Sequence, residues 1–465
     1  MRKTLSAEGE LWTEGGVLTM KETEDPRERR RKARGCRSGG DVGRGCGSGS
    51  ACSCGCGLRL QLRQRLRLPL RCGLLLLCLA PSCAAPRVRT GLEILAADGF
   101  RSLKGMRVGL ITNSAAVDSR LRPTAQLLSG AEGVHFAALF APEHGLAGSL
   151  AAGERVEDRR DPVTGVPVHS LYGKNRRPTA EMLRGIDILI YDLQDVGARP
   201  YTYLSTLVGA LESVRAAGIE LWVLDRPDPL GGSAIDGPVL DRRFESFVGA
   251  HPIPLRHAMT PGEFARLVNE ERGIGARLRV VAMEGWRRGM AWDETGLPWI
   301  APSPNIPTPA TCHLYPGFVL IEGTNLSEGR GTTRPFHLFG APWLDGRAVA
   351  EWLNLSGLAG VAFRAVEFTP TDSKHRGALC SGVEVHVLDP AAFRASAAVV
   401  EVIRAVMTRH PAEFKFLPES FDRLAGSDSL RRALEEKARP EVITGSWAPG
   451  QEEFLRRRAR FLLYR

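Results

Sequence analysis

The chain has 465 residues, a globular composition and a formal charge of +10, which is enough sequence for two or three domains. The excess charge lies at the start, because residues 1–83 contain 16 Lys and Arg against 8 Asp and Glu, and the remainder contains 46 against 44. Such a nearly neutral body argues against nucleic-acid binding. Eight of the ten cysteines also precede residue 84, so a disulfide framework or a paired-cysteine zinc site is excluded from the body.

Residues 1–57 show no hydrophobic periodicity and are rich in Gly, Ser and Arg. Their stretch CGSGSACSCGCG, which begins at Cys46, contains no histidine, and we do not interpret it as a metal site. We interpret residues 1–57 as a disordered extension or as sequence upstream of the true translation start.

Residues 58–85 have the three parts of an export signal. A basic segment is followed by an apolar run at about residues 73–80 and then by small residues. The apolar run is too short to remain as a membrane span. These features predict that the body of the protein is exported from the cytoplasm.

The signal ends in LAPSC, which resembles a bacterial lipobox although Ala80 and Pro81 depart from the usual pattern. We therefore expect a periplasmic or cell-envelope lipoprotein that meets the membrane only through a lipid on Cys83. The alternative is ordinary cleavage near Ala84 or Ala85, which would release a soluble, secreted protein.

Residues 90–240 alternate between apolar strands and segments with helical spacing. The predicted strands are RVGLIT from Arg107, HFAALF from His135, IDILIYD from Ile186 and ELWVLD from Glu220. A helix is predicted over residues 201–218, where leucines recur at helical spacing and a glycine ends the pattern. This alternation predicts an α/β fold with a doubly wound parallel sheet.

Polar residues follow each of these strands. In FAALFAPEHGLAG, for example, Pro142 must turn the chain directly after a buried strand and leaves Glu143 and His144 at the strand end. Parallel strands place such ends at one edge of a sheet, where open α/β sheets bind their ligands. No G-x-G-x-x-G follows the first strand, so no nucleotide cofactor is indicated. The polar strand ends are Thr112 and Asn113; Glu143 and His144; Asp192, Gln194 and Asp195; and Asp225 and Arg226.

Residues 241–465 change to Pro- and Gly-rich loops mixed with short elements, which predicts a smaller C-terminal α+β domain that completes a cleft. Its expected strands are RLRVVAMEGW from Arg277, VAFRAVEFTP from Val361 and GVEVHVLD from Gly382. The segment 325–335 has a single apolar residue and two arginines, so it is either a mobile surface loop or a site for an anionic, hydroxyl-rich ligand.

Many strings between residues 91 and 465 resemble the NamZ/YbbC family of bacterial exo-β-N-acetylmuramidases, long catalogued as a domain of unknown function. The resemblance implies a Rossmann-like domain that binds no dinucleotide, a smaller second domain, and release of N-acetylmuramic acid from the non-reducing ends of peptidoglycan fragments during cell-wall turnover. It implies muramyl saccharides as ligands and no cofactor. The strings are GLEIL, GLITN, LFAPEHGLAG, LYGK, DLQDVGARPYTY, LDRPDPLGG, SPNIPT, YPG, EGTNLSEGRGTTRPF, FGAPW and FLLYR.

Glycoside hydrolysis needs a proton for the departing oxygen and a group that stabilises an oxocarbenium-like centre. The family match and the strand-end position make Glu143 the expected general acid/base. The second partner is open: Glu322 is placed first, Glu328, Asp192 and Asp195 also qualify, and the acetamido group of the substrate could replace a protein nucleophile.

N-acetylmuramic acid carries a lactyl ether whose carboxylate is charged, and arginine is the natural residue to bind it. The candidates are Arg330, Arg334 and Arg199, with Tyr201 or Tyr203 offering an aromatic face to the sugar ring. The full set of expected substrate-binding residues is Asn113, His144, Asp192, Asp195, Arg199, Tyr201, Tyr203, Asn305, Asn325, Glu328, Arg330 and Arg334.

Two other functions stay open from the sequence. Glu143, His144, Asp192 and Asp195 could bind a divalent metal in a metal-dependent hydrolase, although no H-x-x-x-H or H-E-x-x-H spacing is present. A non-catalytic lipoprotein that only binds peptidoglycan would carry the same leader. The oligomeric state and the stereochemical outcome are not predicted.

Overall fold

The computed structural model describes residues 87–148 and 159–465. The predicted extension (1–57), the predicted export signal (58–85) and Cys83 lie outside these residues. Among the residues described, no helix combines the length and the apolar composition needed to cross a membrane.

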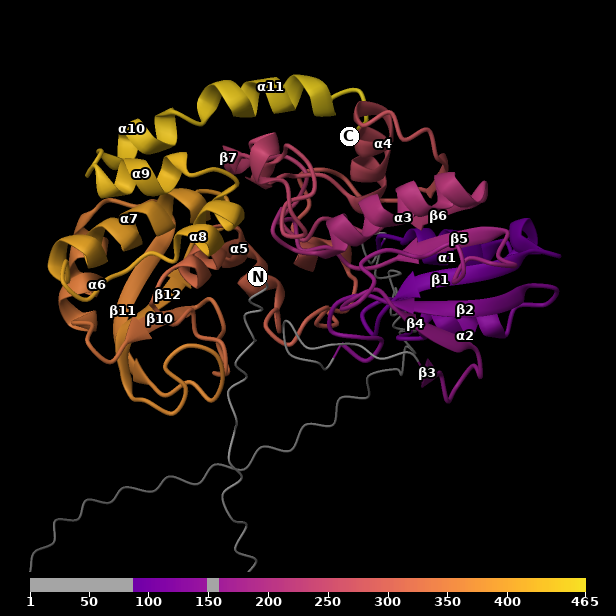
Figure 1. Ribbon diagram of the computed structural model, residues 1–465, viewed down its shortest axis with the longest axis horizontal. Coiled ribbons are helices and arrows are strands. Elements are labelled where there is room, and N and C mark those ends of the chain that lie inside the picture. The colour runs from indigo at the N-terminus through magenta and orange to yellow at the C-terminus, as the bar shows by residue number, and fades with distance from the viewer. Residues whose placement is uncertain (1–86, 149–158) are drawn as a thin grey trace, which may run out of the picture. The chain divides into compact units, whose positions relative to one another are not determined.

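A seven-stranded sheet forms the first region (Figure 1). Six of its strands are parallel, in the order β4-β2-β1-β5-β6-β9, and β3 is added antiparallel at one edge. The order changes direction at β1 and β5, which is the point where open α/β sheets form a ligand crevice. The strands are β1 (Arg107–Thr112), β2 (His135–Ala141), β3 (Arg159–Arg160), β4 (Pro167–Ser170), β5 (Ile188–Asp192), β6 (Glu220–Leu224) and β9 (Arg277–Val281).

Helices cover both faces of this sheet because successive side chains of its buried strands point to opposite sides. Val108 and Leu110 pack in the cluster that contains α1 (Gly91–Ala97) and α2 (Thr124–Ser129). Ile111 packs in the other cluster, with α3 (Tyr203–Ala217) and α4 (Pro261–Glu271). The predicted α/β class, the four predicted strands and the predicted helix are confirmed.

The strand at Arg277 was expected in the smaller domain, and this prediction is wrong. β9 pairs in parallel with β6, with Leu221 beside Leu278 and Val223 beside Val280, and it ends the large sheet. Its first four side chains alternate between exposed and partly buried, and only the last, Val281, is buried. That pattern is typical of an edge strand, whereas the central strands of the same sheet are continuously apolar.

The second region contains a three-stranded antiparallel sheet in the order β10-β12-β11, and the two predicted strands in β11 and β12 are confirmed. A two-stranded ribbon, β7-β8, precedes it in the chain. The strands are β7 (Asp236–Val239), β8 (Pro254–Arg256), β10 (Leu338–Ala341), β11 (Val361–Phe368) and β12 (Cys380–Val387). The helices are α5 (Pro309–Phe318), α6 (Gly346–Leu355), α7 (Ala395–Arg409), α8 (Pro418–Ala425), α9 (Ser429–Glu435), α10 (Pro440–Gly445) and α11 (Ala448–Arg458); short 3-10 helices are η2 (Arg101–Leu103), η3 (Arg242–Phe244), η4 (Trp292–Thr295) and η5 (Val319–Gly323).

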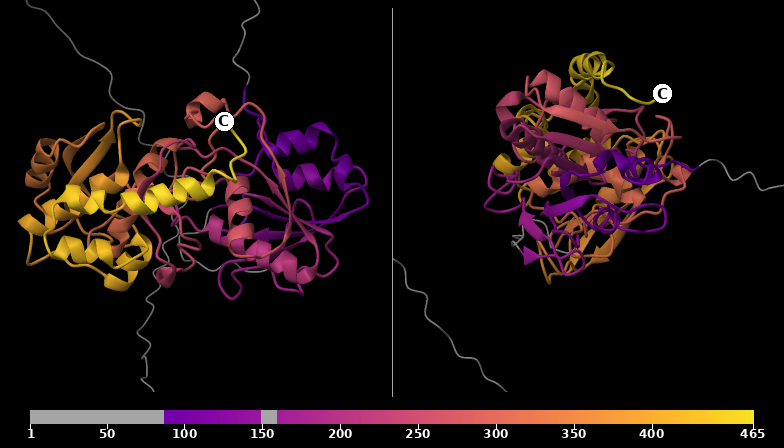
Figure 2. Two further views of the ribbon diagram at one scale, coloured as in Figure 1. Left: turned by 90° about the horizontal axis from the view of Figure 1, so that it is seen from above. Right: turned by 90° about the vertical axis from the view of Figure 1, so that its right-hand side faces the viewer.

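The last residues return to the first region (Figure 2). After α11, the Tyr464 hydroxyl donates to Asp225 Oδ2 at 2.6 Å and accepts from the Met283 amide at 3.0 Å. The Leu463 amide donates to Glu263 at 2.8 Å. The C-terminus therefore supplies hydrogen bonds at the carboxyl end of β6.

Candidate active site

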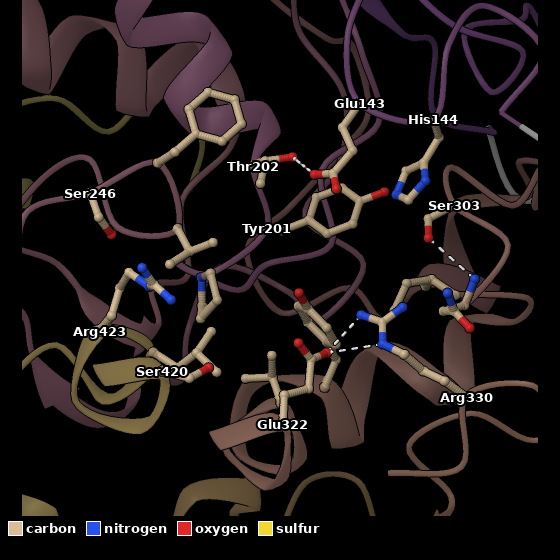
Figure 3. Close-up of a pocket in the computed structure, with 18 of the residues that line it drawn as sticks. Glu143, His144, Tyr201, Thr202, Ser246, Ser303, Glu322, Arg330, Ser420 and Arg423 are labelled. Atoms are coloured by element: carbon tan, nitrogen blue, oxygen red, sulfur yellow. Dashed lines mark hydrogen bonds and ion pairs between the residues drawn. The ribbon is translucent and has the colours of Figure 1, made fainter. Parts of the chain in front are cut away.

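A cavity of about 380 Å³ lies at the carboxyl edge of the large sheet and is lined from both regions of the chain (Figure 3). This volume falls in the range of small-molecule binding sites. Its lining combines acidic, basic, hydroxyl and aromatic side chains. They are Glu143, His144, Tyr172, Arg176, Pro200, Tyr201, Thr202, Ser246, Phe247, Val248, Ser303, Asn305, Ile306, Tyr315, Val319, Glu322, Arg330, Phe336, Ser420, Arg423 and Leu424.

Glu143 reaches this cavity because the chain turns sharply after β2. The Gly145 amide donates to the Pro142 carbonyl at 3.0 Å, and His144 has a φ of 70°. A non-glycine residue seldom adopts this left-handed conformation, which is more common at functional sites. The Thr202 hydroxyl donates to Glu143 Oε2 at 2.6 Å, and Glu143 is 8% exposed. Its carboxyl group is therefore held in a fixed position at the cavity wall.

Tyr172 is a second contact of Glu143 that sequence reasoning missed. Burial, the charge of Glu143 and a hydrogen bond to that carboxylate raise the pKa of Tyr172 to about 12. The tyrosine therefore remains a hydrogen-bond donor to Glu143 at physiological pH. The sequence signal was the string LYGK, which we used for the family resemblance without assigning Tyr172 a role.

Glu322, on η5, lines another wall of the cavity (Figure 3). Arg330 donates to its Oε1 from Nη2 at 2.6 Å and from Nε at 3.2 Å. Burial raises the pKa of Glu322, the Arg330 charge lowers it, and Glu328 raises it again, so that the net direction is upward. Burial lowers the pKa of Arg330, but the charges of Glu322 and Glu328 together raise it by more, so the net direction is upward and Arg330 is charged. The predicted pair of carboxyl groups, Glu143 and Glu322, thus lines one cavity.

Aromatic rings connect these two walls. Tyr201 meets Tyr315 edge to face with ring centroids 6.0 Å apart, and Tyr315 meets Phe336 at 4.9 Å. Arg330 lies over Phe336 with its guanidinium carbon 5.2 Å from the ring centroid. A mixed aromatic and polar wall of this kind suits a sugar, whose faces are apolar and whose edge carries hydroxyl groups. Tyr201, which was expected to offer an aromatic face to the sugar ring, lines the cavity.

Asn113 and Tyr203 are buried behind the cavity and do not line it. Asn113 Nδ2 donates to the Tyr203 hydroxyl at 2.7 Å, and that hydroxyl donates to the Pro302 carbonyl at 2.7 Å. These bonds fix the segment that carries Ser303 and Asn305 into the cavity. The two residues expected to bind substrate therefore position the loop that contributes the predicted Asn305.

Arg199 was expected to bind the substrate carboxylate, but it is 1% exposed and its side chain is enclosed by backbone carbonyls. Its Nη2 donates to Leu424 O at 2.9 Å and to Ala425 O at 2.7 Å, and its Nη1 donates to Pro238 O and Ile253 O. Burial lowers the pKa of Arg199 to about 9, which leaves it charged at neutral pH. Arg199 joins the C-terminal end of α8 to the β7-β8 ribbon.

Asp192 and Asp195 are also buried away from the cavity lining. Asp192 pairs with Arg226, whose Nη2 lies 3.0 Å from Oδ2, and it accepts from Thr124. Asp195 Oδ2 accepts from the Gly197 amide at 2.8 Å and lies 3.3 Å from His257 Nε2. Within the described ranges, no group of three or more His, Cys, Asp or Glu side chains has the arrangement of a metal site. The proposed four-residue metal ligand set is therefore not brought together.

The remaining predicted residues hold the second region together. Asn325 pairs with the backbone of Glu413 and Lys415. Glu328 is buried and lies 3.0 Å from Lys374 Nζ. Arg334 is ion-paired with Glu384 and does not line the cavity. Of the loop 325–335, the only expected binding residue that reaches the cavity is Arg330.

Several cavity residues were not found by sequence reasoning. They are Arg176, Thr202, Ser246, Phe247, Ser303, Tyr315, Phe336, Ser420 and Arg423. They come from loops, from α5 and from α8. Thr202, Ser303, Tyr315 and Phe336 lie in strings that carried the family resemblance but were assigned no role, and the others lie in no such string.

Comparison with known proteins agrees with the two-part organisation. The sequence profile described as exo-beta-N-acetylmuramidase NamZ, N-terminal, matches residues 108–310, and the corresponding C-terminal profile matches residues 313–464. A relative from Bacillus subtilis (strain 168), peptidoglycan beta-N-acetylmuramidase NamZ, is 47% identical over 380 residues, which is 82% of this chain and 92% of the relative.

Two crystal structures of DUF1343 family proteins from Bacteroides fragilis NCTC 9343 are similar to this fold. The first is 37% identical with a TM-score of 0.76, and the match covers 82% of this chain and 99% of that chain. The second is 30% identical with a TM-score of 0.66 and the same coverage.

Proposed function

This chain belongs to the NamZ family of exo-β-N-acetylmuramidases, and on that basis we propose that the cavity holding Glu143 and Glu322 is its active site. The protein is a glycoside hydrolase that releases N-acetylmuramic acid from the non-reducing ends of peptidoglycan fragments. The observation that carries the assignment is the carboxyl group of Glu143, fixed by Thr202 and Tyr172 at the wall of a polar cavity.

In the proposed reaction Glu143 gives its proton to the glycosidic oxygen as the bond from that oxygen to the anomeric carbon breaks. A water molecule then adds to the anomeric carbon, and Glu143 takes back a proton from it. The oxocarbenium-like centre is stabilised by Glu322, oriented by Arg330, or by the acetamido oxygen of the substrate itself. The aromatic wall of Tyr201 and Tyr315 supports the sugar ring.

The test is turnover by the purified full chain. It should hydrolyse para-nitrophenyl β-N-acetylmuramide, and it should release N-acetylmuramic acid from fragments that begin with that sugar but not from fragments that begin with N-acetylglucosamine. Binding of these fragments without turnover would favour the non-catalytic peptidoglycan-binding alternative. Loss of turnover in a chelator, restored by a divalent metal, would favour the metal-dependent alternative.

We also propose that the protein acts outside the cytoplasm, held to the membrane by a lipid on Cys83. The basic, apolar and small-residue segments of 58–85 support export, and the string LAPSC supports lipidation. A Cys83→Ser variant should then move from the membrane fraction to the soluble fraction of the producing cell. Identical fractionation of the variant and the parent would show that this cysteine is not the anchor.

A further inference from the structure

Three arginines line the cavity, and they differ in how far neighbouring protein groups compensate their positive charges. Arg330 lies 2.6 Å from Glu322 and 3.4 Å from Glu328. Arg176 has its guanidinium carbon 4.9 Å from the centroid of the Phe247 ring. Arg423 has no ion pair, side-chain hydrogen bond or ring contact with any residue in the described ranges 87–148 and 159–465. Its positive charge faces the cavity without a protein counter-charge (Figure 3).

The backbone that carries Arg423 is nevertheless rigidly held. Its neighbours on α8, Phe421 and Leu424, are buried, and the Leu424 carbonyl accepts from the enclosed Arg199. Asp422 is ion-paired with Arg431 at 2.8 Å. The helix therefore presents the Arg423 side chain to the cavity from a fixed origin, which lowers the entropy lost when a ligand is bound.

Two hydroxyl groups lie at the same end of the cavity as Arg423 (Figure 3). Ser246 Oγ is buried and has no hydrogen-bond partner among the described residues. Ser420 precedes Arg423 by three positions on α8, so the two side chains share a face of that helix. A free guanidinium beside free hydroxyl donors is a suitable site for a carboxylate.

We infer that Arg423, with Ser246 and Ser420, binds the carboxylate of the lactyl ether that distinguishes N-acetylmuramic acid from N-acetylglucosamine. This inference rests on the proposed function. It moves the recognition of the carboxylate away from Arg330, whose charge is already neutralised by two glutamates, and from Arg199 and Arg334, which do not line the cavity. Arg423 is thus a specificity-determining residue, and Glu143 and Glu322 perform the chemistry on other walls.

The test compares three substrates: the para-nitrophenyl β-glycosides of N-acetylmuramic acid, of its lactyl carboxamide and of N-acetylglucosamine. Arg423→Leu should lower kcat/KM for the muramide by about 10-fold, mostly through KM, because a charge-assisted hydrogen bond at an exposed side chain is lost. Rates for the two uncharged substrates should not change. Arg439→Leu, at an exposed arginine before α10, is the control for the same change of charge outside the cavity.

Equal losses on all three substrates would overturn the inference, because they would show general damage to the site. So would unchanged kinetics of Arg423→Leu, or a selective loss only in Arg176→Leu, which would place the carboxylate at the neighbouring arginine. Each of these results requires an active parent enzyme. A parent without activity on any muramide would instead remove the proposed function.

Discussion

The end of β2 and the ends of β5 and β6 look alike in sequence, since each places a carboxylate soon after a buried strand, but they have different surroundings. Glu143 lines the cavity and is held by hydroxyl groups. Asp192 is fully buried against Arg226, and Asp225 is fully buried under Thr260 and Tyr464. The comparison shows that a carboxylate at a strand end lines the cavity at β2, whereas at β5 and β6 an arginine or a distant chain segment has closed over it.

The first prediction, which has the largest expected effect, concerns the transferable proton of the carboxyl group at the end of β2. Glu143→Gln keeps the shape of the side chain and an acceptor for Thr202, but it has no acidic proton to transfer. We expect muramide hydrolysis to fall by about 10²–10⁴-fold with an unchanged melting temperature. Glu132→Gln, at an exposed glutamate before the same strand, is the matched control. Near-normal turnover by folded Glu143→Gln protein would remove Glu143 from the acid/base role.

The second prediction concerns the same isosteric change, from a carboxylate to an amide, at the end of β5. Asp192→Asn leaves the Arg226 charge buried without its partner, because the side chains of this pair are 0% and 5% exposed. We expect the free energy of unfolding in urea to fall by about 3 kcal/mol, with specific activity retained by the folded fraction. Asp187→Asn breaks an exposed pair with Arg107 and should cost less than about 1 kcal/mol. Equal small losses in both variants would show that the buried pair is not structural.

The third prediction has the smallest expected effect and concerns how the free energy of unfolding depends on pH through the carboxyl group at the end of β6. Burial raises the pKa of Asp225 to about 7, so the folded state keeps a proton that the unfolded state has already lost. Its contribution to stability is complete below the unfolded pKa near 4 and is lost as the pH rises through about 7. Relative to Asp225→Asn, the parent should lose about 2 kcal/mol of stability between pH 5 and pH 7, measured by urea unfolding. Parallel pH profiles of the two proteins would contradict this assignment.

The first region could be predicted from sequence because its information is local. The continuous apolar run ILIY in β5 and the turn at Pro142 each depend on only a few neighbouring residues. Patterns of this kind predicted the α/β class and placed Glu143 at a strand end. The exception is β9. Its sequence predicts a half-exposed strand that could belong to either sheet, and only its pairing with β6 in the structure decides between them.

The site was only partly predictable because its remaining groups depend on contacts between distant segments. Arg199 lies in the string DLQDVGARPYTY, but two of the four carbonyls that enclose it come from α8, more than 220 positions later, and the other two come from Pro238 and Ile253. Arg423 lies on that helix in a sequence with no motif, and only the folded chain shows that it faces the cavity. A sequence states which residues are charged, but the partners of those charges are set by the tertiary structure.

The return of Tyr464 to Asp225 couples the stability of two segments that lie far apart in the chain. The hydroxyl that completes the hydrogen bonds of the Asp225 carboxyl and the Met283 amide lies 239 positions after that carboxyl and 181 positions after that amide. Release of the segment that carries Tyr464 leaves both polar groups without this partner, and a buried polar group that loses its partner destabilises the fold. We therefore expect local opening of this segment to lower the stability of the large sheet as well.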